Sequence, residues 1–108
     1  MKIKKIRIKG KVIEAKVCDN IFSQAMGLMF KRKSMPLFFI FKNSKMRAIH
    51  SFFCKPFVAV WFDKDKVIDV KVIKKWKFSI KPKKNFDKLL EIPEGDVTFK
   101  EFLDEEKV

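Results

Sequence analysis

The chain has 108 residues and a mass of 12.9 kDa, which predicts one domain with a single core, residues 1–108, and argues against a multi-domain enzyme. Hydrophobic residues make up 47% of the chain and charged residues 36%, and this composition argues against intrinsic disorder. Lys and Arg number 26 against 13 Asp and Glu, and the resulting net charge of +13 favours an anionic partner.

The N-terminal half is expected to form strands around one helix. Residues 3–9 and 11–18 alternate basic and apolar side chains, and the alternation changes phase at Gly10, which predicts two strands joined by a turn or bulge. Asp19 then precedes apolar residues at helical spacing, which predicts a short helix. The continuous apolar run Leu37–Phe41 is typical of a strand buried on both faces.

A β-meander is predicted to follow. Residues 46–54 have high β-propensity, and residues 57–62 and 67–73 predict two strands that meet at the turn Asp63–Asp65. The sequence therefore indicates an α+β domain that is mainly β.

The last quarter of the chain changes character from basic to acidic. Residues 74–84 are expected to form a longer loop or an irregular strand, and the apolar residues of 89–92 run into a turn at 93–96. Thr98, with an acid three residues later, predicts a capping box at the start of an acidic C-terminal helix over about 97–106.

The lack of a recognisable signal peptide and the low cysteine content favour a cytoplasmic protein. Met1 leads directly into charged residues, so the apolar region of a signal peptide is missing. The longest apolar run, Pro36–Phe41, is far shorter than the roughly 20 residues that cross a bilayer, so no membrane partner is predicted. Cys18 and Cys54 are expected to be free thiols in a reducing compartment. The oligomeric state is not indicated by any pattern.

Several short stretches between residues 10 and 96 form a recognisable set. They are Met26–Met29, Leu37–Phe41, Ile49–Phe53, Lys75-Trp76, Lys81–Lys83 and Leu90–Gly95. Together they resemble a widespread uncharacterised protein family, domain of unknown function 192. The resemblance implies a small curled antiparallel sheet or open barrel with one or two short helices. It implies no reaction.

One departure from the family pattern affects an acidic position. Members of the family that this chain resembles commonly carry Pro-Ile/Leu-Asp shortly after the Phe-Phe element, and the matching stretch here is Phe57–Ala59. Ala59 therefore stands where the resemblance implies a carboxyl group. Without this carboxyl group, the chain lacks either a group that serves a chemistry common to the family or only the acceptor of a structural hydrogen bond.

His50 is the single histidine and the first candidate for chemistry. In a strand it would share one face with Phe52 and Cys54, with about 13 Å between the Cα atoms of His50 and Cys54. This cleft is the alternative site, for an enzyme or a metal-binding protein. Zinc needs three or four ligands, and same-face neighbours at this distance rarely reach hydrogen-bond contact, so no metal, cofactor or catalytic residue is predicted.

The second candidate is a segment in which lysines alternate with aromatic residues. Single-stranded nucleic-acid binders combine a cationic groove with stacking aromatic side chains, although alternation also arises when aromatic residues pack inward and lysines point to water. Nucleic acid or another polyanion, an unspecified protein or small ligand, and a substrate remain open as partners. We expect a non-catalytic binding module for an anionic partner, contacted by Lys74, Lys75, Trp76, Lys77, Lys81, Lys83 and Lys84.

Overall fold

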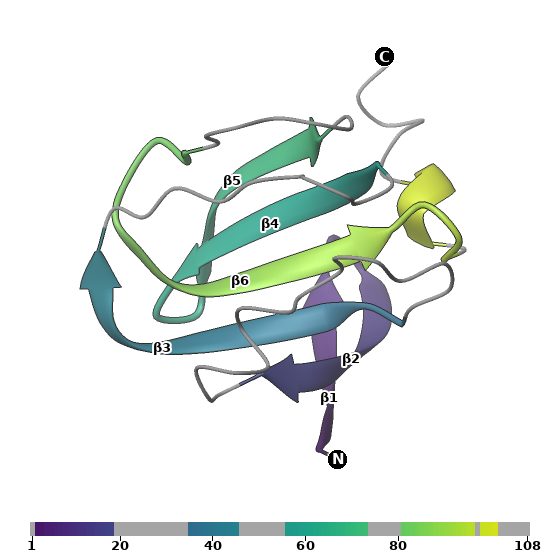
Figure 1. The fold of residues 1–108 in the computed structure, drawn as a ribbon, viewed down its shortest axis with the longest axis horizontal. Helices are drawn as coiled ribbons and strands as arrows, with labels where there is room; N and C mark the ends of the chain where they lie inside the picture. Colours follow the sequence, from purple (N-terminus) through teal and green to yellow (C-terminus); the bar gives the residue numbers. More distant parts are fainter. Residues whose placement is uncertain (1, 19–34, 46–55, 74–80, 97, 102–108) are drawn as a thin grey trace.

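The fold is a single six-stranded sheet to which every described strand belongs. The computed structural model describes residues 2–18, 35–45, 56–73, 81–96 and 98–101. The strands are β1 (Ile3–Ile8), β2 (Lys11–Cys18), β3 (Leu37–Lys45), β4 (Phe57–Asp63), β5 (Lys66–Ile73) and β6 (Phe86–Pro93). They lie in the order β1-β2-β3-β6-β4-β5, so the last described strand is inserted between β3 and β4 (Figure 1). This architecture confirms the prediction of a mainly β domain with a curled sheet.

Strand pairing is antiparallel with one exception. β2 and β3 run parallel and pair over three residue pairs, from Lys16–Leu37 to Cys18–Phe39. The segment between these strands is long enough for the crossover that a parallel pair requires. The curled sheet expected from the resemblance is therefore antiparallel apart from this one described pair.

Two apolar cores cover opposite sides of the sheet. In β4 all residues from Phe57 to Phe62 are buried, and successive side chains enter the two cores alternately. The first core includes Ile6 of β1 and Val70 of β5. Because the two edge strands of the sheet both contribute to the first core, this core lies inside the curl. The second core contains Trp61 and lies on the other side.

Tight turns connect the two hairpins. The β1–β2 turn consists of Lys9 and Gly10, with φ values of 50° and 79°. Two successive positive φ values are typical of a type I′ turn, so Gly10 forms a turn rather than a bulge. In the β4–β5 turn, Lys64 has a φ of 58°.

The end of the described chain corrects the predicted capping box. Thr98 already lies in the helical segment of residues 98–101, and Asp96 is the capping residue. Its Oδ2 accepts hydrogen bonds from the backbone N–H of Thr98, at 3.1 Å, and from the Thr98 hydroxyl. Asp96 precedes Thr98 by two residues, which is the usual spacing between a cap and the N–H that it satisfies.

Other predicted elements lie outside the described residues. These are the helix after Asp19, the β-prone segment 46–54, residues 74–80 of the predicted loop, and residues 102–106 of the C-terminal helix.

Candidate anion-binding site

The predicted basic segment is only partly described. Lys81, Lys83 and Lys84 are exposed. The other predicted contact residues lie outside the described part of the chain: Lys74, Lys75, Trp76 and Lys77. The residues of the alternative site, His50, Phe52 and Cys54, also lie outside the described part of the chain. Both sets stay predictions. Cys18 is described, and its buried thiol donates to the carbonyl oxygen of Lys16 at 3.8 Å.

Residues 81–84 are attached to the edge strand β5 through their backbone. The Nζ of Lys71 donates to the carbonyl oxygen of Lys81 at 2.7 Å. Asp69, which is only 9% exposed, accepts from the backbone N–H of Lys83 at 3.1 Å. Because the backbone carries these contacts, the segment is held in place while the lysine side chains remain in solvent. The sequence pattern did not reveal Asp69 as this anchor.

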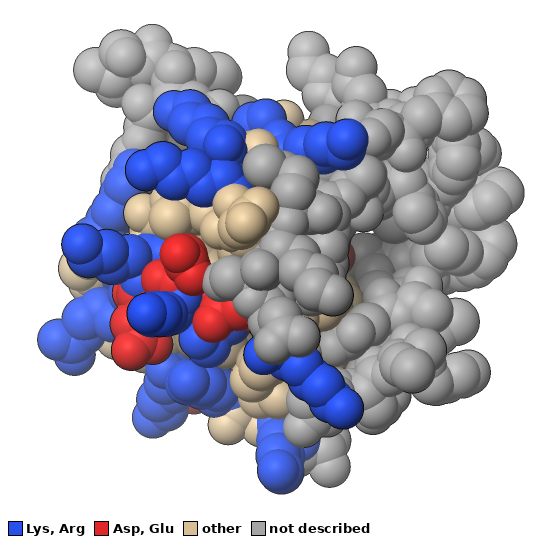
Figure 2. Space-filling model, turned by 90° about the vertical axis from the view of Figure 1, so that its left-hand side faces the viewer, with Lys and Arg blue, Asp and Glu red and all other residues tan. Residues whose placement is uncertain are grey.

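A basic pocket of about 190 Å³ opens between β1 and the β4–β5 turn. Residues of four strands and of the β4–β5 turn line it. Its lining contains five bases, one acid and three apolar residues: Lys4, Lys5, Arg7, Lys64, Lys88, Asp65, Ile6, Phe38 and Phe62. Figure 2 shows the side of the molecule on which β3 ends, β6 begins and the β4–β5 hairpin turns. There Lys and Arg side chains surround a small group of acids.

The pocket exists because the sheet curls. β1 is one edge strand and β5 is the other, so residues 4–7 and residues 64–65 come from opposite ends of the strand order. They line one pocket because the two ends of the sheet approach each other. We call this region the seam.

The base of the pocket is aromatic and well packed. The rings of Phe38 and Phe62 meet edge to face, with 5.8 Å between centroids and 79° between planes. They are 3% and 5% exposed. The Nζ of Lys4 lies 5.4 Å from the centroid of Phe38, a cation–π contact that holds this ammonium group at the pocket. A low-polarity base strengthens the attraction between a cation and an entering anion.

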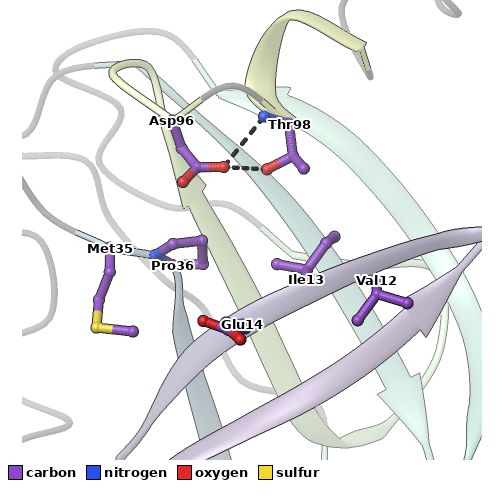
Figure 3. A pocket seen from close by; sticks show the side chains of 7 residues that line it. All are labelled: Val12, Ile13, Glu14, Met35, Pro36, Asp96 and Thr98. Carbon is purple, nitrogen blue, oxygen red and sulfur yellow. Dashed lines mark hydrogen bonds between the residues drawn. The ribbon is translucent and has the colours of Figure 1, made fainter.

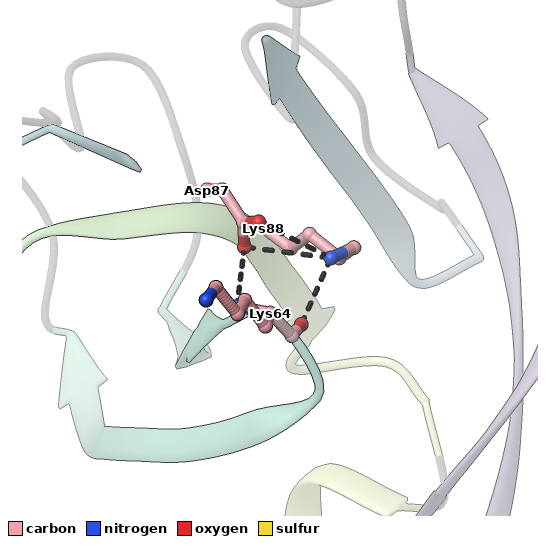
Figure 4. A network of polar contacts seen from close by, with 3 residues as sticks. All are labelled: Lys64, Asp87 and Lys88. Carbon is pink, nitrogen blue, oxygen red and sulfur yellow. Dashed lines mark hydrogen bonds and ion pairs between the residues drawn. The ribbon is translucent and has the colours of Figure 1, made fainter. Parts of the chain in front are cut away.

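A small polar network fixes another side of the pocket (Figure 4). Lys88 donates from Nζ to the carbonyl oxygen of Lys64 at 2.8 Å, and its Nζ lies 3.4 Å from both carboxylate oxygens of Asp87. Asp87 also accepts from the backbone N–H of Lys64 at 3.0 Å. Asp87 therefore offsets the charge of Lys88 and holds the turn, while the ammonium group of Lys64 takes no part in this network.

A second pocket of about 260 Å³ has a different character (Figure 3). Its lining residues are Val12, Ile13, Glu14, Met35, Pro36, Asp96 and Thr98. The two carboxylates suggest a cation site, but Asp96 is engaged with Thr98 as the helix cap. No group of three or more His, Cys, Asp or Glu that could hold a metal ion occurs in the described ranges. Within the same ranges, no helix has the length and apolar character to cross a membrane.

One buried acid was missed by sequence reasoning. Glu91 lies on the central strand β6, 7% exposed, between Leu37 of β3 and Ala59 of β4. Burial raises the pKa of Glu91 to about 8, so its carboxyl is mostly protonated at neutral pH. Ala59, the departure from the family pattern, lies directly opposite this acid. On the same side of the sheet, the buried Nε1 of Trp61 has no hydrogen-bond partner among the described residues. An acid between Leu90 and Ile92, in the apolar second half of β6, was the available signal.

Comparison with known proteins yields relatives without an assigned activity. The sequence profile of domain of unknown function 192, described as "Uncharacterized ACR", matches residues 4–104. UPF0127 protein PH1112 of Pyrococcus horikoshii is 34% identical over 86 residues, which cover 76% of this chain and 74% of that protein. UPF0127 protein PF1050 of Pyrococcus furiosus is 31% identical over 93 residues, which cover 81% and 79%.

Two solved structures share the fold. One is a protein from Sinorhizobium meliloti 1021, provisionally described as a transcription regulator, with a TM-score of 0.71 and 14% identity over 89% of this chain and 81% of that one. The other is a protein of unknown function from Novosphingobium aromaticivorans DSM 12444, with a TM-score of 0.71 and 17% identity over 86% and 72%. At these identities the likeness establishes a common fold and nothing about activity.

Proposed function

The chain belongs to the uncharacterised family of domain of unknown function 192, and from this premise we propose that it is a non-catalytic binding module for an anionic polymer, with single-stranded nucleic acid as the partner. The observation that carries the proposal is the seam pocket, where five bases and one acid gather at a fixed place on the sheet. A uniformly basic surface would support only weak and diffuse attraction. A pocket with positioned cations favours a defined contact.

The kind of cation favours contact with the backbone of a nucleic acid over reading of base edges. Only three of the 26 bases are Arg, and an ammonium group acts as a point charge where a guanidinium group acts as a bidentate fork. Sequence-specific reading of duplex DNA is therefore disfavoured. The provisional regulator among the solved structures shares the fold at 14% identity and adds no support for DNA reading.

Two basic surfaces would hold the strand. One is the seam pocket, and the other is the segment of Lys81, Lys83 and Lys84, whose backbone is anchored on β5. The predicted contacts would extend that segment, because they end three residues before it in the sequence: Lys74, Lys75, Trp76 and Lys77. Stacking of Trp76 on a base would add affinity without sequence preference.

The test is a binding titration with fluorescently labelled single-stranded RNA and DNA of about 16 nucleotides, with heparin as a competitor. Anisotropy is measured at several salt concentrations. We expect the logarithm of the association constant to fall with the logarithm of salt concentration by about 0.7 for each phosphate contacted. Heparin that competes as well as unlabelled oligonucleotide, or binding that is absent at physiological salt, would overturn the proposal.

A matched pair of variants separates a defined surface from overall charge. Lys81→Gln, Lys83→Gln and Lys84→Gln together should weaken binding and flatten the salt slope by about 0.7 for each phosphate that the variant no longer binds. The control carries Lys2→Gln, Lys9→Gln and Lys100→Gln, which remove the same charge at other exposed positions. Equal weakening by both triple variants would mean that the net charge alone attracts the polymer.

A further inference from the structure

The seam pocket has the shape and charge of a site for one phosphate group. Its cations come from three directions: residues 4–7 lie on β1, Lys64 lies in the β4–β5 turn, and Lys88 lies on β6. Its base ends at the packed rings of Phe38 and Phe62. A group that enters the pocket therefore meets positive charge on its sides and an apolar surface beneath.

Arg7 supplies the group best suited to phosphate. It is the one arginine in the described part of the chain, it is exposed, and it lines this pocket. The residue opposite it on β2 is Val12, and none of the ion pairs found among the described residues involves Arg7. A guanidinium group without a carboxylate partner is free to bind two phosphate oxygens at once.

The charge of the pocket favours a dianion. Asp87 offsets Lys88, and Asp65 is the one acid in the lining. The other cations of the lining are Lys4, Lys5, Arg7 and Lys64, so four cations accompany one acid there. A phosphate monoester carries a charge of roughly −1.5 to −2 at neutral pH, because its second pKa is about 6, whereas a diester within a strand carries a single charge.

The closed base favours the end of a strand over its middle. A phosphodiester continues into the polymer on both sides, so it needs a groove that is open at both ends. The rings beneath the pocket are almost fully buried, so a bound group cannot continue through the base. A terminal phosphate is attached on one side only and can enter such a pocket from above.

We infer that the seam pocket binds a phosphate monoester and that its occupant is the 5′-terminal phosphate of the single-stranded nucleic acid. This inference rests on the proposed function, which supplies the nucleic acid. A small free phosphate monoester would offer the pocket the same chemistry, and the measurement below distinguishes the two sources.

The experiment compares three oligonucleotides that differ only at the 5′ end. One carries a 5′-phosphate, one carries a 5′-hydroxyl, and the third carries a 5′-hydroxyl but is one nucleotide longer, so that it gains one internal phosphate. We expect the first to bind on the order of tenfold more tightly than either of the others. Arg7→Gln should abolish the preference and Arg7→Lys should reduce it, because lysine keeps the charge and lacks the fork.

The basic segment provides the internal control. The triple variant of Lys81, Lys83 and Lys84 should weaken all three oligonucleotides equally and keep the preference for the 5′-phosphate. Circular dichroism and thermal unfolding verify that each variant is folded, and Arg7 is exposed on an edge strand, where substitutions are well tolerated.

The outcomes separate the two proposals. Equal affinity for all three oligonucleotides overturns the pocket inference and leaves the proposed function standing. Absence of binding to every oligonucleotide overturns the proposed function. In that case, backbone and Arg7 side-chain NMR signals are followed during titration with glycerol phosphate. Shifts that Arg7→Gln removes support a phosphate monoester pocket with a small free ligand, and unchanged spectra overturn the pocket altogether.

Discussion

Replacing Glu91 by Gln should remove a large pH dependence from the stability of the protein. The substitution keeps the shape of the side chain and removes its proton equilibrium. Glu91 lies in the middle of the sheet, and the residues opposite it are Leu37 and Ala59, which offer no charge to stabilise a carboxylate. Burial therefore raises the pKa of Glu91 from 4.5 to about 8 in the folded state.

The magnitude follows from the two pKa values. Between pH 4.5 and pH 8 the folded protein keeps a proton on Glu91 that the unfolded chain releases. The free energy of unfolding therefore falls as the pH rises, by about 1.4 kcal/mol per pH unit. From pH 5 to pH 7 the contribution of Glu91 decreases by roughly 2.7 kcal/mol. Below pH 4.5 it is fully present, and above pH 8 it is lost.

The assay is urea denaturation followed by tryptophan fluorescence at pH 5, 6, 7 and 8, for the wild type and Glu91→Gln. The quantity of interest is the difference in the free energy of unfolding between the two proteins, because the contributions of all other groups cancel in it. Glu14→Gln, on the exposed face of β2, serves as the control and should keep the wild-type slope. A Glu91→Gln protein with the same pH slope as the wild type would refute the argument.

Three further substitutions test the packing. Ala59→Asp places a second carboxyl opposite Glu91 at a fully buried position, and we expect a loss of roughly 1–3 kcal/mol at pH 7 in urea denaturation; unchanged stability would mean that the site accommodates an acceptor. Asp87→Ala removes the acceptor of the Lys64 N–H and should cost about 1–2 kcal/mol, with faster hydrogen exchange at that amide as the check. Leu90→Ala, at a fully buried position of the first core, should cost about 2–5 kcal/mol in thermal unfolding, and a loss below about 1 kcal/mol would contradict the described packing.

Local features of the fold could be predicted because the sequence encodes them locally. The first two strands follow from alternating lysine and apolar residues, and their turn follows from Gly10, which adopts the positive φ that glycine tolerates. The strand over 57–62 was also predicted, although its burial on both faces becomes clear only when its neighbours β5 and β6 are known. The predicted capping residue, Thr98, was wrong because Asp96 lies two residues earlier and is an equally good capping residue.

The candidate site depends on contacts that no local pattern encodes. Arg7 and Lys64 are far apart in the sequence, and they meet because the sheet curls until its edges approach. Hydrophobic periodicity reports which face of a strand is buried, but it does not report which strands are neighbours. Lysine-rich segments are therefore visible in the sequence, whereas the pocket that forms where the two ends of the sheet meet is not.

The position of β6 in the sheet has a consequence for how the protein is made. The strand that joins β3 to β4 is the last one among the described strands, so within the described sheet β1–β3 and the β4–β5 hairpin have no direct pairing until residues 86–93 are available. During synthesis both portions are expected to have unpaired strand edges until β6 pairs with them, and such edges promote aggregation. A ribosome that stalls before residue 86 would therefore release a product with two incomplete halves, whereas one that stalls after residue 93 would release a chain that already contains every strand of the described sheet.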